Sequence, residues 1–185
     1  MAYSKKESEY LLKLARDAIA SAFNKKPLKI ANIPPPCLDK RSCFVTLTQD
    51  GGQLRGCIGH ILPTQELYKN VIGNARAAAF SDPRFPPLKP DELDKIKIEI
   101  SIIGSPQKLA LSDKDAMLRH LEKNKPGVII KKGPRQATFL PQVWQQLPNP
   151  ADFLTHLCHK AGLGPNEWKN DLEIEIYDVE KIKET

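Results

Sequence analysis

A succession of β-hairpin, helix and strand occurs twice along this chain, and it constrains the fold more than any other feature. In the first half, a hairpin over 43–61 turns at the glycines of QDGGQ, a helix spans 64–80 and a strand spans 95–103. The same order recurs in the second half, over 127–140, 149–161 and 172–179. Hairpins and single strands joined through helices predict an α+β fold with a mostly antiparallel sheet.

Both halves carry the motif Ile-Glu-Ile in their last strand, at 98–100 and 174–176, although the halves are otherwise almost unrelated in sequence. The repeat is therefore one of architecture rather than of residues. The alternative is coincidence, because Ile-Glu-Ile suits any strand.

Capping residues predict where the helices begin. Ser4 and Glu7 form a capping box ahead of an amphipathic helix over 4–23. The expected first residues of the other helices are Thr64, Ser112 with Asp115, and Asn149 with Pro150. The first helix and its proline-rich connector are assigned to an N-terminal segment, 1–36, and the remainder to a main domain, 37–185.

Composition indicates a globular protein without a membrane span. The chain has 185 residues, of which 41% are hydrophobic, which is enough for a core. No apolar run approaches the roughly 20 residues that cross a bilayer. The first residues lack the apolar stretch of a signal peptide, so a cytoplasmic location is expected.

The basic residues are concentrated near the N-terminus. Residues 1–43 hold nine Lys and Arg against four Asp and Glu, whereas the remainder is nearly balanced. Nucleic-acid binders usually carry a basic stripe across the domain itself. Weak, sequence-independent nucleic-acid binding by the segment 5–29 is therefore only an alternative.

The stretch LRGCIG, residues 54–59, raises the question of a site. In a regular strand Arg55, Cys57 and Gly59 share one face, and a guanidinium near a thiol favours the thiolate. Gly56 and Gly59 are expected to allow close backbone approach, with Cys57 lining a cleft. The alternative is a small buried cysteine in a bulged or bent strand.

A cysteine nucleophile usually needs a base, and the histidines do not supply one from the sequence alone. His60 alternates to the strand face opposite Cys57. His156 and His159 flank Cys158 but point away from the apolar stripe that contains it. No C-x-x-C pair or H-E-x-x-H motif occurs, so we expect reduced cysteines, no metal and no cofactor.

The stretch NARAAAFSDPRF, residues 74–85, supplies the second group of candidates. Asn74 lies at the edge of an apolar helical stripe and needs hydrogen-bond partners. Arg84 either pairs with Asp82 to stiffen the turn or binds an anionic group of a ligand. Gly73 and the following alanines suggest that another backbone packs closely, and Thr138 is a weaker candidate for ligand binding.

Six motifs in order carry a family resemblance: LRGCIG, NARAAAFSDPRFPPL, IEISII, ATFLPQVW, FLTHLCHKAGL and the later Trp168. The chain resembles the AMMECR-type domain family over about residues 8–180. The resemblance implies two β(3)-α(2)-like repeats that share one barrel-like sheet with flanking helices, in one compact unit. It implies no established activity. Prokaryotic members often accompany a Memo-type protein and a radical-SAM protein, as AmmeMemoRadiSam system protein A.

Two hypotheses of different classes follow. The first is a binding component for a ligand or protein partner, acting with Memo-type and radical-SAM proteins. The second is an enzyme with Cys57 as nucleophile or redox thiol, Arg55 favouring its thiolate and Arg84 holding an anionic group. Neither hypothesis defines a substrate or an oligomeric state.

Overall fold

The computed structural model describes residues 2–24, 26–49, 51–110 and 113–184. The chain forms two compact units: unit 1 contains residues 1–103 and 180–185, and unit 2 contains residues 104–179. Within the described ranges, no helix has both the length and the apolar character needed to cross a membrane.

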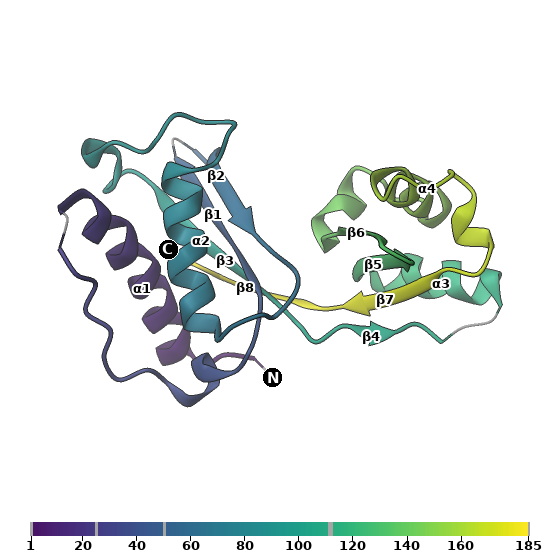
Figure 1. Cartoon of the computed structure of the whole chain (residues 1–185), viewed down its shortest axis with the longest axis horizontal. Helices are drawn as coiled ribbons and strands as arrows, with labels where there is room; N and C mark the ends of the chain where they lie inside the picture. The colour runs from purple at the N-terminus through teal and green to yellow at the C-terminus, as the bar shows by residue number, and fades with distance from the viewer. Residues whose placement is uncertain (1, 25, 50, 111–112, 185) are drawn as a thin grey trace. The chain divides into compact units, whose positions relative to one another are not determined.

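Unit 1 is a four-stranded antiparallel sheet with two helices on one face (Figure 1). Its strands are β1 (Cys43–Gln49), β2 (Gln53–Gly59), β3 (Lys97–Ile103) and β8 (Val179–Lys183), in the order β2-β1-β3-β8. Its helices are α1 (Lys5–Asn24) and α2 (Leu67–Phe80), and two short 3-10 turns are η1 (Pro35–Leu38) and η2 (Pro90–Glu92). The inward residues of β1 and β3 and the apolar stripes of both helices form one buried cluster.

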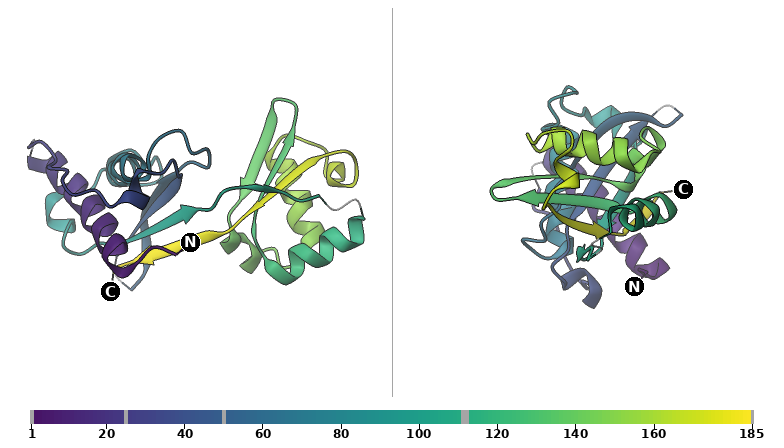
Figure 2. Two further views of the ribbon diagram at one scale, coloured as in Figure 1. Left: turned by 90° about the horizontal axis from the view of Figure 1, so that it is seen from below. Right: turned by 90° about the vertical axis from the view of Figure 1, so that its right-hand side faces the viewer.

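Unit 2 has its own four-stranded sheet and its own core. Its strands are β4 (Gln107–Lys108), β5 (Gly127–Lys132), β6 (Arg135–Phe139) and β7 (Glu173–Tyr177), in the order β4-β7-β5-β6. Its helices are α3 (Lys114–Asn124) and α4 (Pro150–Lys160), and its 3-10 turns are η3 (Pro141–Gln145) and η4 (Glu167–Lys169). Figure 2 shows the green β5–β6 hairpin beside the yellow strand β7. Stacking of Trp144 on Phe153 lies within this second core.

The α+β class and the architectural repeat are confirmed. In unit 1 a hairpin, a helix and a third strand give the order β2-β1-β3, and in unit 2 the equivalent elements give β6-β5-β7. In each sheet a further strand, β8 or β4, follows on the chain from the third strand of the other sheet.

The single barrel-like sheet is not confirmed. The strands form two separate sheets, and the described residues contain no closed one. Each sheet also has its own hydrophobic cluster, which differs from the expected single compact unit. The sequence predicted a single strand over 172–179. The structure instead has two strands here, because β7 ends at Tyr177 and β8 begins at Val179 in the other sheet.

Two of the predicted helix starts are confirmed. Ser4 and Glu7 exchange capping hydrogen bonds, and Asn149 Oδ1 accepts hydrogen bonds from the backbone N–H groups of Ala151 and Asp152. The prediction for Thr64 is wrong, because α2 begins at Leu67 without a side-chain cap. The N-cap of α3 is Asp113, and Asp115 lies in the first turn of the helix; Ser112, the other predicted start residue, lies outside the described residues.

Candidate functional site

The two glycines of LRGCIG allow close backbone contact. A Cβ atom on Gly56 would lie 2.1 Å from the carbonyl oxygen of Ala78 in α2. A Cβ atom on Gly59 would lie 2.4 Å from the Phe44 ring, on the neighbouring strand. Gly73 serves no such purpose, because nothing lies within 4 Å of a Cβ atom placed there. Close approach therefore occurs at Ala78, and the expectation for Gly73 is wrong.

A β-bulge separates Arg55 from the regular pattern of β2. Leu47 of β1 pairs with Gly56, but the next residue, Thr48, pairs with Leu54, so Arg55 has no partner in β1. Strict alternation of faces does not hold across such a bulge. The expectation that Arg55 shares a face with Cys57 depended on that alternation and is therefore not supported.

Arg55 is committed to a buried ion pair. Its side chain is 6% exposed, and its Nε and Nη2 atoms donate to the two carboxylate oxygens of Glu92, at 2.8 and 3.1 Å. These hydrogen bonds lower the pKa of Glu92, which also accepts a hydrogen bond from the Lys89 backbone N–H. The Arg55 charge is therefore balanced inside the fold.

Cys57 is held through both its backbone and its side chain. Its N–H donates to Asp82 Oδ2 at 2.8 Å, and its carbonyl oxygen accepts from Arg84 Nη2 at 3.2 Å. The Thr46 hydroxyl donates to the Cys57 sulfur at 3.3 Å. The residue is half-buried, and it therefore presents part of its surface to solvent.

Asp82 and Arg84 form the pair that would stiffen the turn. Arg84 Nε donates to Asp82 Oδ1 at 3.0 Å, Arg84 Nη2 donates to Oδ2 at 2.7 Å, and the Arg84 backbone N–H donates to Oδ1. The Asp82 side chain is 2% exposed and the Arg84 side chain 54%. The structure thus brings Cys57, Asp82 and Arg84 together, with the arginine charge already neutralised.

Protonation of Asp82 at low pH should weaken its hydrogen bonds with Arg84 and with the Cys57 backbone. Hydrogen bonds from Arg84, and then from the Cys57 N–H, hold the Asp82 pKa well below its ordinary value. A carboxylate with a lowered pKa stabilises the folded state fully above the unfolded value of about 3.9, and this stabilisation is lost as the pH falls further. We expect Asp82→Asn to lower the free energy of unfolding by about 2 kcal/mol at pH 7. Urea unfolding at several pH values should show this difference shrinking below about pH 4; a difference that stays constant down to pH 2 would contradict the assignment.

Asn74 is a structural residue of unit 1. Its Nδ2 atom donates to the carbonyl oxygen of Cys43 at 2.9 Å and fixes α2 to the start of β1. Sequence reasoning missed Asn70, one turn earlier, whose Nδ2 atom donates to the Arg41 carbonyl oxygen at 2.6 Å. The signal was present, because Asn70 lies on the same buried helical stripe as Leu67.

Thr138 belongs to a hydrogen-bond network of unit 2. Its hydroxyl donates to the Val128 carbonyl oxygen at 2.8 Å and lies 2.9 Å from the Tyr177 hydroxyl. Burial raises the pKa of Tyr177 to about 12. A Cβ atom on Gly127 would meet the Tyr177 ring at 2.3 Å. These contacts join β5, β6 and β7, so Thr138 has a structural explanation without a ligand.

The cysteines differ sharply in exposure. All four are free, and Cys37, Cys43 and Cys158 are buried, whereas Cys57 is half-buried. Burial raises the pKa of Cys37 to about 11 and of Cys43 to about 12, and it also raises that of Cys158.

Thiol labelling of the native protein should therefore modify Cys57 first. With iodoacetamide and peptide mass mapping, we expect Cys57 to react at least about 100-fold faster than Cys43 or Cys158, which need a local opening. The Cys57→Ser variant should show no fast phase. Equal rates at Cys57 and Cys43 would contradict the packing described here.

The described residues contain no group of three or more His, Cys, Asp or Glu side chains that could hold a metal ion. His156 and His159 are exposed on α4 while Cys158 is buried, as the helical pattern predicts. Among the hydrogen bonds of the described chain, none joins a histidine to Cys57. The Nε2 atom of His60 is itself buried without a hydrogen-bond partner in this part of the chain.

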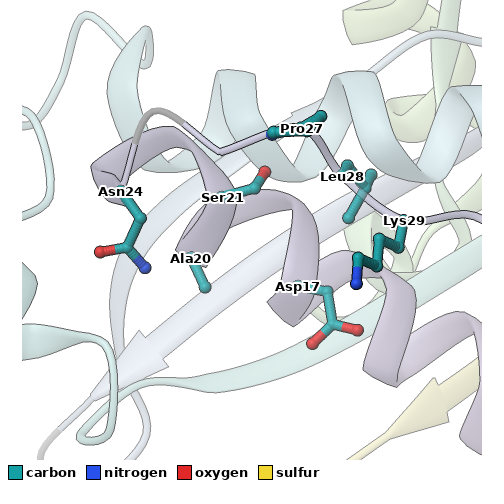
Figure 3. A pocket seen from close by; sticks show the side chains of 7 residues that line it. All are labelled: Asp17, Ala20, Ser21, Asn24, Pro27, Leu28 and Lys29. Atoms are coloured by element: carbon teal, nitrogen blue, oxygen red, sulfur yellow. The ribbon is translucent and has the colours of Figure 1, made fainter.

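A hollow of about 230 Å³ lies beside the second half of α1 (Figure 3). Its walls come from the helix and from the segment that follows it: Asp17, Ala20, Ser21, Asn24, Pro27, Leu28 and Lys29. None of the residues predicted to be catalytic or ligand-binding lines this hollow, although its lining residues all belong to the segment 5–29 considered for nucleic-acid binding. Cys57 and Arg84 are instead joined by direct contacts at the edge of the sheet.

The fold and the contacts around Cys57 define a class: an α+β protein of two sheet-and-helix units. In unit 1, Gly56 packs against α2, and Cys57 is hydrogen-bonded to Asp82 and Arg84 in the turn after α2. The AMMECR1 family model matches residues 12–182, and the chain belongs to the AMMECR1 family. The predicted resemblance is thereby confirmed.

Relatives support the same assignment. Protein MK0488 of Methanopyrus kandleri is 37% identical over 188 residues, covering 96% of this chain and 88% of the relative. Protein Mbar_A1807 of Methanosarcina barkeri is 37% identical over 184 residues, covering 96% and 90%. The crystal structure of uncharacterized protein PH0010 from Pyrococcus horikoshii is similar with a TM-score of 0.83 and 31% identity, covering 98% of this chain and 93% of that one.

Proposed function

We propose that this chain is a noncatalytic, cytoplasmic binding component that acts with a Memo-type protein and a radical-SAM protein. The association with these two classes comes from the pattern described for prokaryotic members of the family. The structure supports the noncatalytic part of the proposal through the chemistry around Cys57.

The pairing of both candidate arginines carries this proposal. Arg55 is bound by Glu92 and Arg84 by Asp82, so neither charge is left over to activate a thiol or to hold an anionic substrate. An activated cysteine normally lies beside an uncompensated cation or a histidine base. Within the described residues, the surroundings of Cys57 satisfy neither condition. The contacts of Asp82 and Arg84 with the Cys57 backbone instead stabilise the edge of the sheet.

Direct binding tests the proposal. The purified full chain is titrated by calorimetry with the Memo-type protein and, separately, with the radical-SAM protein of the same organism. We expect a saturable complex with at least one of them. A protein of similar size and charge, unrelated to either class, is the control. Absence of binding to both proteins, alone and together, would overturn the proposed function.

A Cys57-dependent enzyme is the second candidate, and one observation favours it: Cys57 is half-buried while the other three cysteines are buried. Exposure alone gives an ordinary thiol rate. An activated thiol would react with iodoacetamide near neutral pH at least about tenfold faster than the cysteines of the urea-unfolded chain. A rate at or below that of the unfolded chain excludes the activated nucleophile.

Nucleic-acid binding has less support. Two of the N-terminal lysines pair with acidic residues one turn along α1, Lys5 with Glu9 and Lys13 with Asp17. Such exposed pairs reduce the local positive field that would attract a phosphate backbone. We therefore rank this function below the other two.

A further inference from the structure

Strand β2 forms one edge of the unit 1 sheet. In an antiparallel pair, every second residue turns its N–H and C=O groups away from the neighbouring strand. Cys57 is such a residue, because Asp82 accepts from its N–H and Arg84 donates to its C=O. The two side chains thus occupy, at Cys57, the donor and acceptor positions that another strand would occupy.

The central part of β2 has no protection of its own. Edge strands are normally guarded by charged side chains or prolines, which prevent pairing with a further chain. Gly56, Cys57, Ile58 and Gly59 include neither. The charges that cover this edge come instead from the turn after α2, through Asp82 and Arg84.

We propose that the outer edge of β2 is a latent interaction surface for a second copy of this chain, and that the Asp82–Arg84 pair keeps it closed. The proposal is independent of the proposed function, since it rests only on the contacts of this edge.

The chemistry of β2 favours a second copy as the occupant. An antiparallel pairing centred on Cys57 is self-complementary, because each Cys57 would donate its N–H to the other and accept in return. No charged side chain from 56–59 would oppose another across this pairing.

The Asp82–Arg84 pair closes the edge of β2 in two ways. It satisfies the Cys57 backbone groups, which removes the gain that a new strand would bring. It also places a buried carboxylate at the edge, so that two copies would bring two Asp82 carboxylates close together. Removing Arg84 alone leaves the second effect in place, and removing both side chains cancels both effects.

The test compares Asp82→Ser/Arg84→Ser with the wild type by sedimentation velocity, in the full chain. We expect the double variant to form a dimer at concentrations where the wild type and Arg84→Ala do not.

Paired residues of this kind lie about 5.5 Å apart at Cα, within the range of a disulfide. Mild oxidation with diamide should therefore cross-link Cys57 in the double variant at least about tenfold faster than in the wild type. The matched control, Asp91→Ser/Lys95→Ser, removes an exposed ion pair of the same unit and should behave as the wild type.

Folding is checked by circular dichroism. Where the double serine variant does not fold, Asp82→Asn/Arg84→Gln keeps the shape of both side chains and weakens their hydrogen bonds by removing the charges. This variant should dimerise and cross-link more than the wild type but less than the double serine variant, because the amides still partly satisfy the Cys57 backbone groups. The proposal would be overturned by a folded variant of either kind that remains in the same oligomeric state as the wild type. A dimer that does not cross-link through Cys57 would also overturn it.

Discussion

Replacing Gly56 with alanine is expected to lower the free energy of unfolding by about 3 kcal/mol, because the new methyl group overpacks a filled interface. The added Cβ atom would lie 2.1 Å from the Ala78 carbonyl oxygen, which belongs to the backbone of α2. Neither atom is at the end of a flexible side chain, so the helix must shift relative to β2. Urea unfolding followed by far-ultraviolet circular dichroism measures the effect.

Gly73→Ala is the matched control for this prediction. Gly73 lies inside the same helix, is exposed, and has nothing within 4 Å of an added Cβ atom. Alanine there should raise the free energy of unfolding by about 1 kcal/mol, because glycine is a poor helix former. If the two substitutions have equal effects, close approach does not explain the glycine of LRGCIG.

Glu92→Gln is expected to cost about 3 kcal/mol of folding free energy, because it leaves the Arg55 guanidinium buried without a counter-charge. Arg55 is 6% exposed on its side chain, and its Nη1 atom already lacks a partner in the described part of the chain. The amide retains the shape of the carboxylate, so the measured loss reports charge rather than packing. The same urea unfolding measurement applies.

The control lies one residue away in the same 3-10 turn. Asp91 pairs with Lys95 at 3.8 Å, and both side chains are mostly exposed. Solvent screens such pairs, so Asp91→Asn should change the free energy of unfolding by less than about 0.5 kcal/mol. A loss at Glu92 no larger than that at Asp91 would show that the Arg55 pair is not buried in solution.

The sequence predicted the elements better than their assembly. Apolar periodicity and turn glycines located both hairpins, and Asn149 with Pro150 marked the start of α4 correctly. The same pattern could not show that the chain leaves one sheet at Tyr177 and enters the other at Val179, because only one residue, Asp178, separates the two strands. Periodicity describes one strand at a time and contains no information about which neighbour it pairs with.

The candidate residues were predicted more successfully than their roles. LRGCIG and SDPR were singled out, and the structure joins them through the Cys57 backbone. A bulged strand was the alternative reading of LRGCIG, and the structure has a bulge there. Its position at Arg55 could not be predicted, because alternation does not reveal which residue is the extra one. Glu92 was missed for a related reason: its partner is 37 residues distant in the chain. The conclusion that follows is that most of these residues hold the fold.

Under the proposed function, the Cys57 region is scaffold and the chain acts by binding. Calorimetric titration of the Memo-type and radical-SAM proteins with Cys57→Ser, beside the wild type, tests it most directly. Serine keeps the size of the side chain and removes thiol chemistry. We expect the folded variant to lose about 1 kcal/mol of stability and to bind with a Kd within about twofold of the wild type, a difference in binding free energy of less than about 0.5 kcal/mol. A folded variant whose binding is abolished would contradict it.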